Sequence, residues 1–174
     1  MEFKNYSKYS KLSIVVLMIA IAIRIVLSLN HAISGDACWH LSGAKFIGEN
    51  LQLPFEESIG RQADEAFWPP PLFHIIASFF YILFGNFGLK LTPLLFGSLS
   101  LIFANLIFRK FLDERKTFFA TFFISFIPIA MDYSVLGYPA STVTFFIILS
   151  IYFAVNNMFF ISGLITSLAI LTKY

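Results

Sequence analysis

The chain has little charge and almost no cysteine, and each scarcity excludes a class of protein. Only 13% of its 174 residues are charged, and the formal net charge of +2 is too small to argue for nucleic-acid binding. The single cysteine, Cys38, excludes an intrachain disulfide and a cysteine-rich metal cluster. The sequence also lacks a glycine-rich phosphate loop, a nucleophile elbow and a zinc-protease motif, so it gives no support to soluble nucleotide-sugar chemistry.

Apolar side chains are what the chain has in abundance. Hydrophobic residues make up 58% of the sequence, 23 residues are phenylalanine, and the mean hydropathy is positive. These values lie far outside the range of a soluble globular domain. The phenylalanines occur inside apolar runs without a repeating pattern, which is typical of lipid-facing and helix-packing side chains. The composition therefore predicts an integral membrane protein.

The order of the apolar runs predicts an all-α, multi-pass membrane protein, a single membrane domain over residues 1–174. We expect about five spanning helices, at about 12–30, 89–108, 117–131, 140–155 and 159–171. Two juxtamembrane helices are expected within the first external loop, 31–88. The first, 37–49, has a polar face suited to the membrane surface. The second, 71–85, would be about 22 Å long against a hydrocarbon core of roughly 30 Å, so it is too short to cross.

The distribution of charge predicts the orientation. Lysines precede the first apolar run, and arginines and lysines follow the run that ends at residue 108. The first run is long enough to be a retained span and not a cleaved signal. Both basic segments are therefore expected in the cytoplasm, with the acidic segment 31–69 outside. In this topology six polar residues share the outer face: Asp36, His40, His74, Asp132, Tyr138 and Lys173.

The stretch 35–44, GDACWHLSGA, holds the strongest candidate for chemistry. Asp36 and His40 are four residues apart, so in a helix both side chains lie on one face, where the first span would leave the bilayer. Asp36 is either a reactive carboxylate or the N-cap of a helix that begins at Ala37. The same spacing is usable by a divalent metal, although two ligands are a weak signal.

A series of short motifs runs through most of the chain in a recognisable order. These motifs are Arg24 in the first helix, Gly35-Asp36-Ala37, Pro70-Pro71-Leu72, Phe84-Gly85, Tyr133-Ser134, Pro139, Gly163-Leu164 and the final AILTKY of 169–174. Their order and spacing resemble the N-terminal part of the C-type (GT-C) membrane glycosyltransferases. The relatives concerned are the protein mannosyltransferase and aminoarabinose transferase enzymes, which use polyprenyl-phosphate sugars.

The resemblance implies a hexosyltransferase-like enzyme of the cell membrane. It would transfer a sugar from a polyprenyl-phosphate or pyrophosphate donor to an acceptor glycan, lipid or protein on the extracytoplasmic side. Asp36 would be the catalytic residue, activating the acceptor, and Lys173 and Arg24 would bind the donor phosphate. Lys173 could instead snorkel to the interface, and Arg24 could pair with another helix. Accessory roles are expected for His40, Glu65, His74 and Tyr138.

The chain also departs from this family. Phe67, Trp68 and Pro69 occupy the place of a second acid before the Pro-Pro pair, so a two-carboxylate metal site is in doubt, and Glu65 could replace that acid only if the loop shifts. Gly137 and Tyr138 stand where the family has an arginine. Because family members are longer, we expect a fragment, inactive alone or completed by a second polypeptide.

A second class of function stays open on the sequence. The chain could be a non-catalytic membrane subunit or a transporter-like protein that binds a lipid phosphate. The discriminating feature is the placement of Asp36 and Lys173, which an enzyme needs in one outward cavity.

Overall fold

The computed structural model describes residues 7–33, 35–54 and 70–173, and these ranges contain eight α-helices and no strand. The helices are α1 (Lys8–Asn30), α2 (Asp36–Asn50), α3 (Leu72–Phe84), α4 (Asn86–Phe111), α5 (Glu114–Ser125), α6 (Pro128–Tyr133), α7 (Ala140–Ala154) and α8 (Phe159–Thr172). The predicted all-α class is confirmed.

Among the described residues, α1 and α4 are the two helices long and apolar enough to cross a membrane. They have 23 and 26 residues, so at ~1.5 Å per residue each exceeds a hydrocarbon core of roughly 30 Å. α1 begins after Ser7, whose side chain accepts a hydrogen bond from the Ser10 amide. Large apolar side chains of α1 remain exposed, and Met18 and Val26 each keep 58% of their surface.

Fewer helices than the five predicted spans reach this length, since only α1 and α4 do so in the described part of the chain. The expected span 117–131 is two helices, α5 and α6, because Pro128 lacks the amide hydrogen that would continue α5. α7 and α8 have 15 and 14 residues, about 21 to 23 Å of helix. The apolar runs locate these helices, but each helix alone is shorter than the hydrocarbon core.

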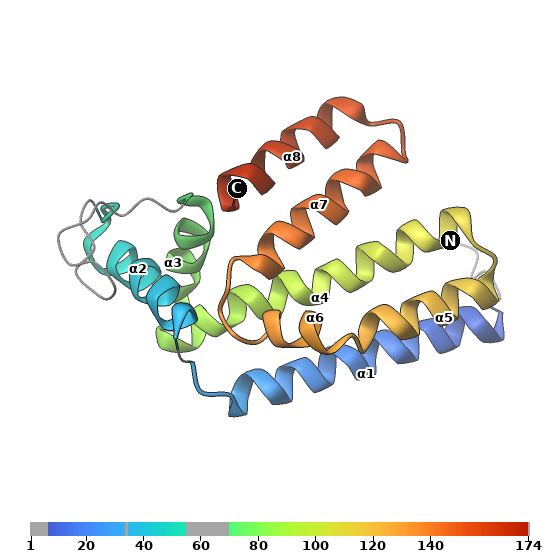
Figure 1. Ribbon diagram of the computed structural model, residues 1–174, viewed down its shortest axis with the longest axis horizontal. Helices are drawn as coiled ribbons and strands as arrows, with labels where there is room; N and C mark the ends of the chain where they lie inside the picture. Colours follow the sequence, from blue (N-terminus) through green and yellow to red (C-terminus); the bar gives the residue numbers. More distant parts are fainter. Residues whose placement is uncertain (1–6, 34, 55–69, 174) are drawn as a thin grey trace.

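The helices form a layered arrangement with two distinct ends (Figure 1). α4 lies at the centre and packs against α5 and α7; α1 packs along α5, and α8 packs along α7. α2 and α3, the two short helices expected in the external loop, pack against each other at one end of this bundle. The C-terminal end of α8 lies at that same end, and α8 contacts α3.

A buried arginine joins α1 to the break between α5 and α6. Arg24 is 1% exposed, and its Nε donates to the Ser134 hydroxyl at 3.0 Å. Its Nη1 donates to the carbonyls of Ala20 at 3.1 Å and Ser125 at 3.0 Å. Because α5 ends at Ser125, that carbonyl needs a donor from outside its own helix. Arg24 supplies it.

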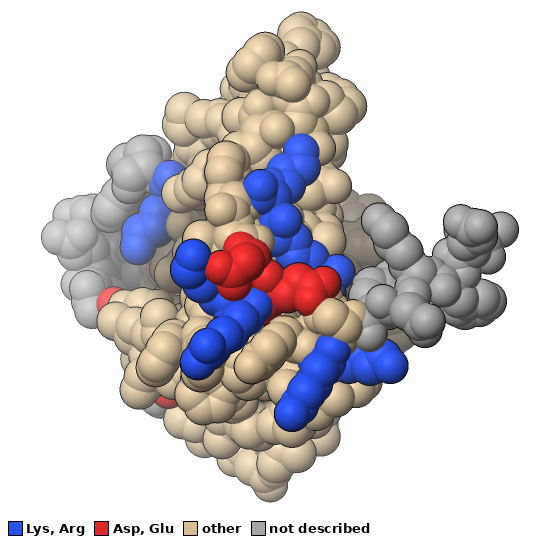
Figure 2. All heavy atoms as spheres, turned by 90° about the vertical axis from the view of Figure 1, so that its right-hand side faces the viewer, with Lys and Arg blue, Asp and Glu red and all other residues tan. Residues whose placement is uncertain are grey.

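The opposite end of the bundle gathers basic residues around a small acidic group. Contacts of Glu114 with the Ser7 and Ser10 hydroxyls bring the start of α1 to the α4–α5 turn, and Lys110 Nζ donates to the Val155 carbonyl in the α7–α8 turn at 3.2 Å. Figure 2 shows this face, with Lys and Arg side chains around Asp and Glu. The segments that meet here carry Lys8, Lys11, Arg109, Lys110, Arg115 and Lys116, with Asp113 and Glu114.

Candidate functional site

A cavity of about 470 Å³ lies at the end of the bundle that carries α2 and the C-terminal end of α8. Its polar lining comes from four segments of the chain: the first turns of α2, α6, the turn before α7, and the residue after α8. The polar residues that line it are Asp36, His40, Asp132, Tyr133, Tyr138 and Lys173. Ile129, Leu136, Pro139 and Ala140 supply the rest of the wall.

Asp36 is the first residue of α2 and lies on the exposed surface of this cavity. The N-cap of α2 is Gly35, which has φ +60°, a conformation that glycine adopts at little cost, so the N-cap position itself carries no side chain. Asp36 therefore does not serve as the N-cap that the sequence left as an alternative. Its position in the first turn is one where the helix dipole favours a carboxylate.

Lys173 follows the last residue of α8 and lines the same cavity as Asp36. The Lys173 side chain is exposed, and its charge acts on His40. The Asp36 carboxylate and the Lys173 ammonium, which are far apart in the sequence, therefore share one cavity. An enzyme of the expected kind needs this placement, with Asp36 and Lys173 in one outward cavity.

His40 and His74 form a hydrogen-bonded pair at the floor of the site. His40 Nδ1 lies 3.0 Å from His74 Nε2, and the His74 side chain is fully buried. Burial lowers the pKa of His40 to about 4, with the Asp36 carboxylate opposing this shift and the Lys173 ammonium adding to it. Burial, followed by the neighbouring His40, lowers the pKa of His74 to about 3, with the Pro70 backbone opposing this shift. Both rings are therefore neutral at pH 7.

Aromatic rings complete the wall around His40. The ring centroids of His40 and Tyr138 are 6.5 Å apart, and those of Tyr133 and Tyr138 are 5.6 Å apart, both pairs edge to face. Trp39 lies 4.8 Å from His40 and 6.4 Å from His74, measured between ring centroids. The cavity thus combines carboxylates, a cation and aromatic edges.

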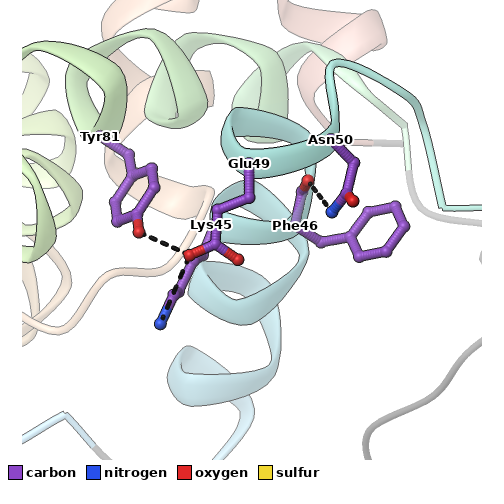
Figure 3. A network of polar contacts seen from close by, with 5 residues as sticks. All are labelled: Lys45, Phe46, Glu49, Asn50 and Tyr81. Atoms are coloured by element: carbon purple, nitrogen blue, oxygen red, sulfur yellow. Dashed lines mark hydrogen bonds and ion pairs between the residues drawn. The ribbon is translucent and has the colours of Figure 1, made fainter.

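Packing between α2 and α3 brings the two histidines together. Leu41 and Ala44 of α2 form a buried cluster with Phe73 and Ala77 of α3 and with Leu89 of α4. On the outer side of the same pair of helices, Glu49 accepts a hydrogen bond from Tyr81 Oη at 2.7 Å and lies 3.8 Å from Lys45 Nζ (Figure 3). These contacts fix the register in which His40 meets His74.

The remaining predicted site residues lie elsewhere. Arg24 does not line the cavity, because its Nε and Nη1 are bound inside the protein at the α5–α6 break. Glu65 lies outside the described residues. No group of three or more His, Cys, Asp or Glu side chains in the described part of the chain is arranged to hold a metal ion. Asp36 and His40 share the cavity, but they gain no third ligand of these types.

Two lining residues, Asp132 and Tyr133, were not among the predicted site residues. Their signal was present in the sequence, because Asp132 was already expected on the same outer face as Asp36, and Tyr133 follows it directly. The break at Pro128 gives α6 its own start, and both residues belong to that helix.

No protein-family model, no curated protein and no solved structure matches this chain.

Proposed function

We propose that the chain is a membrane glycosyltransferase that takes a sugar from a polyprenyl-phosphate donor on the extracytoplasmic side. The observation that carries the proposal is that Asp36 and Lys173 line one cavity. Glycosyl transfer from a lipid phosphate needs a group that activates the acceptor and a cation that stabilises the departing phosphate. The cavity volume of about 470 Å³ lies within the range of small-molecule sites.

The proposed orientation places the basic end in the cytoplasm and the cavity outside. Lysines and arginines gather where the start of α1 meets the α4–α5 turn, as the positive-inside rule requires of cytoplasmic loops. α1 and α4 cross the bilayer in this arrangement. The α5–α6 pair, α7 and α8 lie beside them in the membrane, and tilting or local thinning of the bilayer accommodates their shorter lengths. Exposed apolar side chains such as Phe123, Phe160 and Leu164 support this placement.

In the proposed reaction Asp36 activates the acceptor hydroxyl or amine as it attacks the anomeric carbon, in an inverting transfer. Lys173 binds the donor phosphate and stabilises the negative charge that builds on it as the sugar leaves. Tyr133, Tyr138 and Asp132 are placed to contact the sugar. A metal is not required in this scheme, and Arg24 has a structural role.

The test measures sugar transfer by the full chain in lipid nanodiscs, with polyprenyl-phosphate [³H]mannose as the donor. Asp36→Asn should lower kcat by at least ~10², the size of general base catalysis. Lys173→Gln should lower kcat and raise the KM for the donor. Glu49→Gln is the matched control for Asp36→Asn, and Lys45→Gln is the matched control for Lys173→Gln. Each control removes a charge of the same sign from a residue of α2 that does not line the cavity. Their activity should equal that of the wild type.

Two outcomes would reject the enzyme proposal. Transfer retained in Asp36→Asn removes the catalytic role of this carboxylate. Lys173-dependent binding of the lipid phosphate without transfer to any acceptor favours the non-catalytic subunit or transporter-like protein.

A further inference from the structure

The buried histidine pair is the feature of the site that the proposed function leaves unused. The sequence contains three histidines, and two of them, from α2 and α3, meet at 3.0 Å between ring nitrogens. His74 is fully buried, whereas His40 lines the cavity. The pair therefore connects the interior of the protein to the place where acceptor and donor would react.

The hydrogen bond of the pair relates two tautomers. His40 Nδ1 and His74 Nε2 lie 3.0 Å apart, so in the neutral pair one of these nitrogens donates and the other accepts. When His40 Nδ1 donates, the lone pair of the His40 ring lies on Nε2, and this nitrogen can accept a proton. When His74 Nε2 donates, the proton of His40 lies on Nε2 instead.

The charges around His40 favour donation from His40 Nδ1. Lys173, which follows α8, lines the same cavity as His40, and its ammonium favours a lone pair over an N–H on the cavity side of the ring. Asp36 of α2 favours a positive charge on His40 once a proton arrives. The other titratable groups around this ring are His74 from α3, Tyr138 before α7, and Asp132 and Tyr133 from α6.

We propose that His40 is the proton acceptor of this cavity, held by His74 with its Nδ1 protonated so that Nε2 faces the acceptor substrate. This inference rests on the proposed function and specifies the route of the proton. His74 is a positioning residue, and Asp36 activates the acceptor by stabilising the imidazolium that forms.

The step balances as a single displacement. The acceptor oxygen or nitrogen forms a bond to the anomeric carbon while the bond from that carbon to the phosphate oxygen breaks. The electron pair of the broken bond stays on the phosphate, next to Lys173. The acceptor's proton moves to His40 Nε2, and it leaves for water or for the released phosphate before the next cycle.

Binding of the donor strengthens His40 as a base. In the empty cavity Lys173 opposes a proton on His40, so the ring is a weak base. The donor's phosphodiester, with its one negative charge beside Lys173, offsets that positive charge and places negative charge near the ring. The base therefore gains proton affinity only when the donor is in place.

The first experiment reads the tautomers directly, by ¹⁵N NMR of ring-labelled histidine in the full chain in phosphatidylcholine nanodiscs. His40 and His74 should each carry their proton on Nδ1 at pH 7, with exposed His31 as the internal reference. Lys173→Gln should raise the titration midpoint of His40, because it removes a positive charge. Farnesyl phosphate should raise the wild-type midpoint by about one pH unit or more, and farnesol should leave it unchanged.

A proton on His40 Nε2, or a midpoint that Lys173→Gln does not move, would overturn the proposal. Inorganic phosphate distinguishes a lipid-linked donor from a free phosphate. If inorganic phosphate shifts the His40 titration midpoint as much as farnesyl phosphate does, the proposal that the donor is lipid-linked is overturned. Failure of the proposed function has a different signature, in which the tautomers are as stated but no sugar is transferred.

A pair of variants separates positioning from folding. His74→Gln retains a hydrogen-bond acceptor near the place of Nε2, whereas His74→Phe removes it. We expect His74→Phe to lower kcat about 10- to 100-fold with the KM for the donor unchanged, and His74→Gln to restore both the rate and the His40 tautomer. His40→Gln should lower kcat at least as much as His74→Phe. Equal loss in both His74 variants, with the His40 tautomer unchanged, would reduce His74 to a packing residue.

Discussion

At the scale of single residues, the histidine pair links the site to the stability of the fold. Burial holds the pKa of His40 near 4 and that of His74 near 3, against 6.5 in an unfolded chain. Between these values the unfolded chain binds more protons than the folded one, so protonation favours unfolding. Stability is therefore fully present above about pH 6.5 and is lost as the pH falls toward 4.

We predict that this loss is on the order of a few kcal/mol between pH 7 and pH 4. The measurement is chemical unfolding in detergent micelles across that range. The double variant His40→Gln, His74→Gln keeps polar side chains but cannot take up protons, so its stability should change much less. Equal pH dependence in the two proteins would show that other groups govern the acid sensitivity.

At the scale of helices, close approach of α4 to α6 depends on one glycine. A Cβ added at Gly97 would lie 2.2 Å from the Ser134 Cβ, so alanine there forces α6 away from α4. Ser134 also accepts the hydrogen bond from Arg24 Nε, and its displacement would loosen the α5–α6 break. Gly163 in α8 is a matched control, because a Cβ there meets nothing within 4 Å.

Gly97→Ala should lower the free energy of unfolding by about 1 to 3 kcal/mol, the usual effect of overpacking. Gly163→Ala should be neutral or stabilise the protein by up to ~1 kcal/mol through helix propensity. Thermal unfolding of both variants in the same detergent makes the comparison. A stable Gly97→Ala variant would mean that α6 moves freely relative to α4.

The helices also show which features of the fold can be predicted from the sequence and which cannot. Apolar runs located the helices because hydrophobic periodicity is a local property of the chain. The break at Pro128 and the partners of Arg24 depend on contacts between distant segments, and the run 117–131 alone does not reveal them. Asp36 and Lys173 were expected on one face from charge distribution. The pairing of His40 with His74 required the packing of α2 on α3.

At the scale of the whole molecule, the two ends of the bundle differ in chemistry, and a membrane would separate them. One end carries the lysines and arginines of the α4–α5 turn, and the other carries the cavity. The single cysteine provides a direct test, because Cys38 is exposed on α2 at the cavity end. No cysteine has to be removed before labelling.

A membrane-impermeant maleimide added to right-side-out vesicles should label Cys38 without permeabilisation. In the matched control, Cys38→Ser combined with Arg115→Cys places the thiol on the exposed first turn of α5, at the basic end, where labelling should require permeabilisation. This difference follows from the positive-inside rule applied to the basic end. The reverse pattern would put the cavity in the cytoplasm and would exclude an extracytoplasmic donor. Labelling of both cysteines in sealed vesicles would mean that the bundle does not span the bilayer in the proposed orientation.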